Sequence, residues 1–396
     1  MMQISPETQL FIREHSSDDV RALALQAKKY PDIDMPTAIT QIAGRKVAAE
    51  KIPSWWEIEK IWYPKHLSLE QCSSEITARY KARLLQGDSL TDLTGGFGID
   101  CSFLAIGFKS ATYVERQEEL CEIAAHNFPV LNLNHINIKN EDGVTYLQAM
   151  SPVDCLFLDP ARRNEHGGKT VAISDCEPNV AELEELLLQK ANRVMIKLSP
   201  MLDLSLALKE LKQTQEVHIL SVNNECKELL ILLGQTSPAE ISIHCANLST
   251  KGTQEEQHFV FTREQEQCSE CTYTDSLETY LYEPNASLLK AGAFRSIAAA
   301  YPVRKLHPNS HLYTSDTFIE NFPGRIFRIV NQCSFNKKEV KENLTDLKKA
   351  NVTARNFPAT VAELRKRIHL AEGGDTYLFA STLNNGQKVL IRCEKV

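Results

Sequence analysis

The sequence predicts an α/β protein in which a mainly parallel sheet ends in an antiparallel hairpin. Between residues 89 and 199, five short apolar runs alternate with stretches of helical spacing, the pattern of parallel strands joined by right-handed crossovers. The next two apolar runs, 216–222 and 226–233, are separated by three residues, which permits a hairpin and excludes a parallel crossover. Residues 324–396 alternate strand and helix in a compact α+β pattern.

Four regions are expected along the chain. They are a helical N-terminal region (1–68), the sheet domain (69–238), a connecting region with a small ferredoxin-like module (239–322) and a C-terminal α+β domain (323–396). The first region carries apolar residues at three-and-four spacing, as amphipathic helices do. Its aromatic stretch SWWEIEKIWYP is expected to pack helices on the next domain. Ser68 and Gln71 have capping-box form and predict one helix through about Leu85.

The same patterns place the individual elements. In the sheet domain we expect strands at 89–94, 111–115, 136–140, 154–159 and 192–199, with helices near 98–107, 117–128, 143–150 and 179–190. Two strands are expected within 240–265, and one helix at 286–301. The last domain is expected to hold strands at 324–332, 351–357, 375–382 and 388–395. Its two helices, at 336–350 and 360–370, begin at the capping residues Asn336 and Thr360.

The composition is that of a globular protein, with 43% hydrophobic and 24% charged residues among 396. We find neither an apolar run of roughly 18 residues nor the basic-then-apolar layout of a signal peptide, so the expected location is the cytoplasm. Eleven cysteines are scattered singly, which favours reduced thiols. The CxxC of Cys268 and Cys271 has no second ligand pair nearby, so no metal site is expected.

Charge is unevenly distributed along the chain. The net charge is −7, yet residues 290–368 contain 15 Lys/Arg and 6 Asp/Glu. A basic block on an acidic protein indicates a polyanionic partner, although solvated helix faces would also explain it. The candidate phosphate contacts are Lys337, Lys338, Arg355, Arg365 and Arg367.

A glycine-rich loop, TDLTGGFGID (91–100), follows the first predicted strand and opens a helix. Its glycines let the backbone turn sharply and approach a ligand. Glu115 ends the second strand, where a carboxylate suits ribose hydroxyls, and Asp142 follows the third. The carboxyl ends of these strands therefore predict a nucleoside site. Its candidate residues are Asp92, Thr94, Gly95, Gly96, Gly98, Glu115, Arg116, Asp142, Gly143 and Asp159.

Two features favour S-adenosylmethionine over NAD as the ligand. The dinucleotide fingerprint Gly-x-Gly-x-x-Gly is incomplete, because Cys101 stands at the last glycine. Asp92 would repel a pyrophosphate but suits a sulfonium and an ammonium. The fragment GGKT (167–170) ends like a P-loop, but Arg163 stands where its first glycine should be.

The order of Asp92, the glycine loop and the final hairpin resembles the Rossmann-like class I S-adenosylmethionine-dependent methyltransferases over about residues 70–235. The resemblance implies that Asp92, Gly96 and Gly98 lie around the methionine end of the cofactor. It also implies that Glu115 holds the ribose and that Asp142 lies on the adenine side.

The stretch LFLDPARR (156–163) ends the fourth predicted strand, beside the expected methyl group. Asp159, Pro160 and Arg162 are the candidate catalytic residues, because an acid and a rigid turn can position an acceptor. The motif resembles that of RNA 5-methyluridine enzymes, which use a nucleophilic cysteine after the fifth strand. Leu198 stands there instead, so a covalent mechanism is not expected. Cys176 is the nearest substitute and is expected to pack. The candidate substrate contacts here are Arg163, Lys197 and Ser199.

The whole chain resembles a bacterial family of class I methyltransferases with a helical N-terminal extension and a C-terminal THUMP-like domain. The residues that carry this resemblance are DLTGGFGID, LDPARR, IKLSP, YEPNASLLKAG and TARNFPATVAELRKR. THUMP-type domains are associated with RNA, which agrees with the basic block, so we expect methylation of a nucleotide in structured RNA (tRNA or rRNA). The leucine at position 198 predicts direct transfer without a covalent cysteine adduct. A protein or small-molecule substrate, a non-catalytic RNA-binding protein and an NAD-dependent oxidoreductase remain as alternatives.

Overall fold

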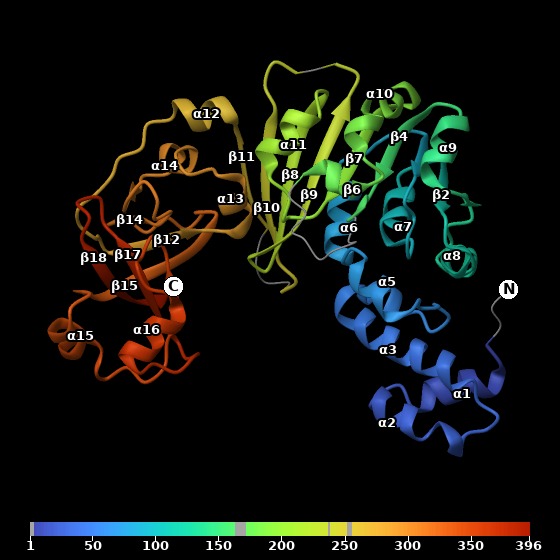
Figure 1. Cartoon of the computed structure of the whole chain (residues 1–396), viewed down its shortest axis with the longest axis horizontal. Coiled ribbons are helices and arrows are strands. Elements are labelled where there is room, and N and C mark those ends of the chain that lie inside the picture. The colour runs from blue at the N-terminus through green and yellow to red at the C-terminus, as the bar shows by residue number, and fades with distance from the viewer. Residues whose placement is uncertain (1–3, 163–171, 237, 252–255) are drawn as a thin grey trace. The chain divides into compact units, whose positions relative to one another are not determined.

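The structure is a computed structural model that describes residues 4–162, 172–236, 238–251 and 256–396 (Figure 1). It divides into two compact units. Unit 1 comprises Met1–Glu216 and Glu228–Pro238, and unit 2 comprises Val217–Lys227 and Ala239–Val396. Within the described ranges, we find no helix with both the length and the apolar character that crossing a membrane requires.

The sheet of unit 1 has the strand order β9-β7-β4-β1-β2-β3. Its strands are β1 (Ser89–Asp92), β2 (Ser110–Glu115), β3 (Ile136–Asn140), β4 (Val153–Leu158), β7 (Ala191–Leu198) and β9 (Glu225–Gly234). The strands from β7 to β3 pair in parallel, whereas β9 runs antiparallel to β7. The predicted fold class is confirmed. Because parallel strands point the same way, the residues that follow them meet at one edge of the sheet.

The hairpin predicted after the parallel strands is also present. β8 (Thr214–Val222) is followed by β9 after only Asn223 and Asn224. Both have positive φ, 50° and 66°, as a two-residue hairpin turn requires and asparagine tolerates. The turn is one residue shorter than expected. The two strands expected within 240–265 are β10 (Ser242–Leu248) and β11 (Gln257–Thr262), which pair antiparallel.

Most helices of unit 1 lie close to their expected positions, but no helix was expected at 173–175 or 204–210. The N-terminal ones are α1 (Pro6–Glu14), α2 (Val20–Leu25), the 3₁₀ turn η1 (Ala27–Lys29), α3 (Met35–Lys51) and α4 (Pro53–Trp56). Those that alternate with strands are α7 (Ile99–Ala105), α8 (Glu118–Val130), α9 (Gly143–Ala149), the 3₁₀ turn η2 (Ile173–Asp175), α10 (Val180–Lys190) and α11 (Leu204–Glu210).

The single helix expected from Ser68 to about Leu85 is wrong. The structure has two helices, α5 (His66–Gln71) and α6 (Glu75–Ala82). The ammonium of Lys51 donates to the carbonyls of Leu69 and Glu70, which would otherwise accept the next intrahelical hydrogen bonds. Between the two helices, Ser73 is buried.

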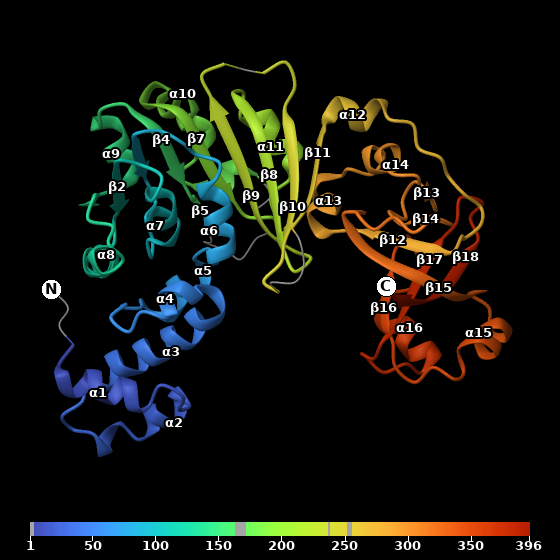
Figure 2. The ribbon, with the colours of Figure 1, turned by 180° about the vertical axis from the view of Figure 1, so that it is seen from behind.

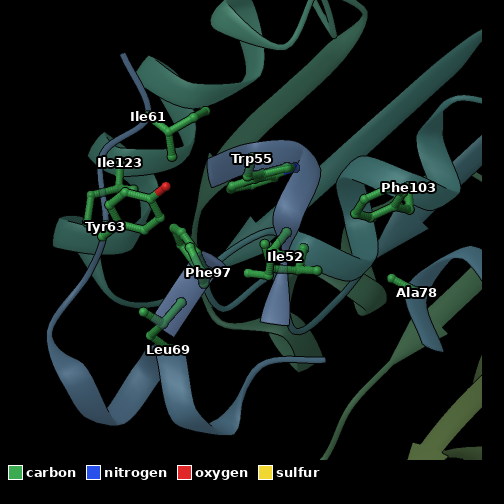
Figure 3. Packing of buried hydrophobic residues seen from close by; sticks show 11 residues of the cluster. Ile52, Trp55, Ile61, Tyr63, Leu69, Ala78, Phe97, Phe103 and Ile123 are labelled. Carbon is green, nitrogen blue, oxygen red and sulfur yellow. The ribbon is translucent and has the colours of Figure 1, made fainter. Parts of the chain in front are cut away.

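The N-terminal helices pack directly on the sheet domain through an apolar core (Figure 3). Phe97 of the glycine loop lies in this core together with Trp55, and their ring centroids are 5.2 Å apart in an edge-to-face contact. Trp62 stacks on His126 of α8 with ring centroids 3.7 Å apart. The expected role of the aromatic stretch is therefore confirmed: it joins the helical region to the sheet domain.

Unit 2 contains a second sheet, with the strand order β13-β14-β12-β15-β18-β17-β16. Its strands are β12 (Tyr280–Pro284), β13 (Arg304–Lys305), β14 (Tyr313–Ser315), β15 (Gly324–Ser334), β16 (Asn351–Ala354), β17 (Thr376–Thr382) and β18 (Lys388–Lys395). Since β12 pairs with β15, this sheet crosses the expected boundary between residues 322 and 323. A core that includes Leu281 and Phe327 crosses it too.

Helices of unit 2 are α12 (Arg263–Cys268), α13 (Ala286–Ala291), α14 (Ser296–Ala300), α15 (Lys337–Leu344) and α16 (Val361–Ile368). The one helix expected at 286–301 is wrong, because Gly292 takes a φ of 78° and ends α13. Asn336 and Thr360 cap α15 and α16 as predicted. Both helices pack on the same face of the sheet (Figure 2), where Leu344 and Leu364 share a core.

Candidate active site

The glycine loop after β1 lies close against β2, and its glycines are required either by close packing or by positive φ values. The N–H of Gly95 donates to the carbonyl of Val114 at 2.8 Å. A Cβ on Gly95 would lie 2.2 Å from the Tyr113 ring, so no larger residue fits without a shift. Gly96 and Gly98 have φ values of 53° and 86°, which other residues rarely adopt. A Cβ on Gly96 would meet only the Thr94 carbonyl, 3.8 Å away.

Glu115, at the end of β2, accepts hydrogen bonds from the backbone of this loop and of its own strand end. Its Oε2 accepts the N–H of Gly96 and its Oε1 accepts the N–H of Gln117, both at 2.9 Å. The residue is 8% exposed. A carboxylate oxygen accepts more than one hydrogen bond, so these contacts orient Glu115 and leave it able to accept from a ligand hydroxyl.

The end of β3 leads into α9 through a tight junction. Asp142 caps α9, because its Oδ1 accepts the N–H groups of Val144 and Thr145. A Cβ on Gly143 would lie 2.2 Å from the Leu93 carbonyl oxygen, so glycine permits this close approach to the segment after β1. Nearby, the exposed Arg116 lies 3.7 Å from Glu177.

Asp92 is buried, and only one of its two carboxyl oxygens accepts a hydrogen bond from the described residues. Its Oδ1 accepts the N–H of Thr94 at 2.9 Å, while its Oδ2 has no hydrogen-bond partner among the described residues. Burial raises the pKa of Asp92 well above its usual range, the Thr94 N–H opposes this, and the charges of Asp100 and Asp159 raise it further. A cationic donor at Oδ2 would relieve this penalty.

Asp159, directly after β4, is held from two sides. Its Oδ2 lies 2.5 Å from the ammonium of Lys197 on β7, and its N–H donates to the Thr94 hydroxyl at 2.6 Å. Its side chain is 36% exposed, whereas that of Lys197 is 9% exposed. Burial raises the pKa of Asp159 and the Lys197 ammonium opposes it. Three predicted residues, Asp159, Thr94 and Lys197, therefore meet here.

The ammonium of Lys197 has three partners within the protein. Besides Asp159, its ammonium donates to Ser73 at 3.0 Å and to Asp100 at 3.2 Å. An ammonium has three donors, and these contacts use all of them. These contacts place Lys197 to orient Asp159, and a contact between Lys197 and a substrate stays a prediction.

Behind Lys197 lie four buried residues that the sequence did not single out, the polar Ser73 and the charged Lys81, Asp100 and Glu228. The Lys81 ammonium is fully buried and lies 2.9 Å from Asp100 and 2.5 Å from Glu228. The sequence did contain a sign of this buried cluster. Lys81 lies on the buried face of α6, and Glu228 directly precedes the apolar run of β9. A charge inside an apolar pattern implies a buried partner.

The other residues of the predicted catalytic motif are only partly described. Pro160 is buried, and β5 (Ala161–Arg162) pairs with β6 (Cys176–Glu177). The side chain of Arg162 and the whole of Arg163 lie outside the described residues, as does the GGKT fragment. Leu198 and Cys176 are buried, 3% and 1% exposed. Ser199 is partly exposed, and its hydroxyl accepts the Met201 N–H at 3.3 Å.

The five basic candidates of unit 2 fall into two groups. Lys337 and Lys338 are exposed on the first turn of α15. The other three are engaged by neighbouring side chains. Arg355 pairs with the buried Glu283 at 3.1 Å, Arg365 lies 3.8 Å from Glu372, and Arg367 lies over the Phe335 ring at 4.1 Å.

Comparison with solved structures decides the family. A candidate methyltransferase from Porphyromonas gingivalis W83 is 34% identical, each chain covers 100% of the other, and the TM-score is 0.87. The chain belongs to this methyltransferase family. Profile comparison matches residues 280–323 of this methyltransferase to a ferredoxin-like domain and residues 324–395 to a THUMP-like domain. No protein with a curated function matches the chain.

More distant structures cover only part of this methyltransferase. An rRNA methylase from Streptococcus thermophilus is 14% identical, with a TM-score of 0.29, over 40% of this chain and 93% of its own. A candidate methyltransferase from Streptococcus mutans, in complex with SAH, is 14% identical, with a TM-score of 0.30, over 40% of this chain and 96% of its own.

The site residues of this methyltransferase fit S-adenosylmethionine, the cofactor of its family. The free space beyond Gly96 allows a ligand to approach the backbone. The unpartnered Oδ2 of Asp92 suits the positive charge of the methionine end. Glu115 places a carboxylate at the carboxyl end of β2 beside the glycine loop, and a carboxylate is the kind of acceptor that ribose hydroxyls require. Which of these residues contact the cofactor remains a prediction.

Proposed function

We propose that the chain methylates a nucleotide of structured RNA, such as tRNA or rRNA, by direct transfer and without a covalent cysteine adduct. The observation that carries the proposal is the ion pair between Asp159 and Lys197 at the carboxyl end of β4. It presents a fixed, partly exposed acid at the place where the family resemblance puts the methyl acceptor.

Methyl transfer requires the protein mainly to position the acceptor and to place charge beside it. The bound cofactor supplies an electrophilic methyl group. Asp159 is fixed through Oδ2 by Lys197 and through its N–H by Thr94, and we assign its Oδ1 to an N–H or O–H of the acceptor. There it orients the acceptor lone pair toward the methyl carbon and can accept the proton that the acceptor loses.

The cysteine positions support direct transfer. A covalent C5 mechanism needs an accessible thiolate beside the base. Leu198 occupies the corresponding position and is buried, and the Cys176 side chain is buried beside β5. Burial withholds a thiol from a substrate, so neither position offers a nucleophile.

RNA is the proposed substrate class because of unit 2. Its THUMP-like match, residues 324–395, overlaps the basic block of residues 290–368. Exposed lysines such as Lys337 and Lys338 suit contacts with phosphates, which hold RNA without reading its sequence.

Nucleoside mass spectrometry tests this proposal. RNA from cells with the gene should contain a methylated nucleoside that is missing from RNA of deletion cells and returns with wild type. Complementation with Asp159→Asn should not restore it. If the two RNA pools are identical, the same comparison of protein and small-molecule extracts decides between the remaining methyl acceptors. If purified protein binds RNA but transfers no methyl group to any of these pools, a non-catalytic RNA-binding role replaces the proposal.

Calorimetry provides the check on the cofactor. Binding of S-adenosylmethionine and no binding of NAD or NADP is expected. Binding of NAD alone would favour an oxidoreductase and overturn the proposal.

A further inference from the structure

The segment before the sheet supplies two buried residues that lie behind the active site. Ser73 is in the turn between α5 and α6, and Lys81 is in the last turn of α6. They are 4% and 0% exposed. Ser73 contacts Lys197, which pairs with Asp159, and Lys81 contacts Ser73 and Asp100, which both contact Lys197.

Ser73 lies at the centre of this group. Its Oγ accepts hydrogen bonds from the ammoniums of Lys81, at 2.8 Å, and Lys197, at 3.0 Å, and donates to Asp100 Oδ2 at 2.7 Å. Asp100 is shared, because its Oδ1 faces Lys81 and its Oδ2 faces Lys197. The two ammoniums are therefore held in fixed positions on either side of one carboxylate.

The buried cluster has more carboxylates than ammoniums, so the pairing of each carboxylate depends on where the two ammoniums lie. Three carboxylates, Asp100, Asp159 and Glu228, share the two ammoniums of Lys81 and Lys197. Without Lys81, Asp100 would have only Lys197 as a cationic partner and would compete with Asp159 for it. Opposite charges at these distances interact strongly when they are withdrawn from water.

We propose that Ser73 and Lys81 are positioning residues for the active site: by satisfying Asp100 they keep the Lys197 ammonium on Asp159, which holds that carboxylate ionised and oriented. The part of this inference that concerns the methyl acceptor rests on the proposed function. The electrostatic coupling itself does not.

The direction of each charge effect on Asp159 follows from the groups that face it. Lys197 comes from β7, Lys81 from α6, Asp100 from α7 and Asp92 from β1, and Glu228 of β9 acts through both lysines. Removal of a cation from this set raises the pKa of Asp159, whereas removal of an anion lowers it. Substitutions at Lys81 and Glu228 should therefore shift it in opposite directions.

The test is a carboxyl carbon NMR titration of protein labelled with ¹³C-aspartate, in which Asp159→Asn identifies the Asp159 signal. In Lys81→Met the pKa of Asp159 should rise by roughly half to one pH unit, and in Glu228→Gln it should fall by a smaller amount. General loosening of the fold would not move the two variants in opposite directions. A shift of the same sign in both, or no shift in either, overturns the inference.

Two further measurements separate this inference from the proposed function. The acid limb of the pH profile of kcat should move with the titration, while the calorimetric affinity for S-adenosylmethionine stays within about twofold. If Lys81→Met does not fold, the isosteric Glu228→Gln decides alone, and an upward shift or no shift overturns the inference. If the titration shifts as expected but no RNA is methylated, the coupling stands and the proposed function fails.

Discussion

The hydroxyl of Thr94 accepts a hydrogen bond from the backbone N–H of Asp159 at 2.6 Å. This bond joins the loop that follows β1 to the loop that follows β4. Since Thr94 also donates its own N–H to Asp92, one residue links a predicted cofactor contact to a predicted catalytic acid.

Thr94→Val should lower kcat about tenfold or more. Valine keeps the shape of threonine but leaves the Asp159 N–H without its acceptor, which costs about 1–3 kcal/mol for a buried group and frees the loop after β4. Thr94→Ser keeps the hydroxyl and should retain most activity in a methyl-incorporation assay. Equal activity of the valine and serine variants would contradict the role given to this bond.

Gly95→Ala should abolish cofactor binding. The added methyl would lie 2.2 Å from the Tyr113 ring, so the loop must move away from β2 at a cost of about 1–3 kcal/mol. Gly107→Ala is the matched control, because its Cβ would meet only the Leu104 carbonyl, 3.8 Å away. Calorimetry with S-adenosylmethionine and thermal unfolding should show losses in the first variant and little change in the second.

Asp100 should make the fold sensitive to acid. Burial alone would raise its pKa, but the ammoniums of Lys81 and Lys197 outweigh burial and hold the pKa well below its usual value. A lowered folded-state pKa gives stability that is present above the unfolded value, about 3.9, and is lost as the pH falls through the folded value.

Asp100→Asn should therefore be less stable than wild type at neutral pH by about 1–3 kcal/mol, because Lys81 and Lys197 lose a charged hydrogen-bond acceptor but each keeps another carboxylate partner. The difference should narrow below about pH 4. Urea unfolding at several pH values measures it. Asp88→Asn, which removes an exposed ion pair with Lys109, should change stability by less than about 1 kcal/mol. A difference for Asp100→Asn that does not depend on pH would refute this account.

Charge reversal on α15 should weaken RNA binding without loss of stability. Lys337→Glu with Lys338→Glu should lower RNA affinity about tenfold or more at low salt and flatten the dependence of affinity on salt, because fewer phosphate contacts release fewer counterions. Lys28→Glu with Lys29→Glu makes the same charge change at an exposed pair in the N-terminal region and should have little effect. Equal losses in both double variants would point to net charge rather than to a binding surface.

Arg355 should matter for stability instead. It pairs with Glu283, whose side chain is 2% exposed and also binds Arg325. Arg355→Ala leaves that buried carboxylate with a single cationic partner, so the melting temperature should fall by several degrees. An unchanged melting temperature together with weaker RNA binding would restore Arg355 to the candidate phosphate contacts.

The sequence was sufficient for the sheet because strand and helix periodicities are local. The alternation of apolar runs located the parallel strands, and the short spacing after residue 222 located the hairpin. The residues that follow strand ends were also predictable, since parallel strands bring them to one edge. Thr94 and Asp159 meet for this reason, and Lys197 lies near the same end of β7.

The buried charges could not be predicted in the same way, because they depend on tertiary contacts. Ser73 lies in the turn between α5 and α6, and its contact with Asp100 depends on the end of α5, which no local pattern predicts. The contacts of Lys197 could not be predicted either, because its partners lie at residues 73, 100 and 159, far apart in the chain. The sequence therefore suggested only a contact with a substrate.

The position of Phe97 sets a limit on how this enzyme can be divided. A fragment that begins at residue 69 would retain every predicted strand of the catalytic sheet, yet it would remove Ile52, Trp55, Ile61 and Tyr63 from around that ring. The Phe97 side chain of the glycine loop would then be exposed to water. We expect such a fragment to aggregate or to lose cofactor affinity, so the N-terminal helices should be inherited and exchanged together with the loop rather than as a detachable module.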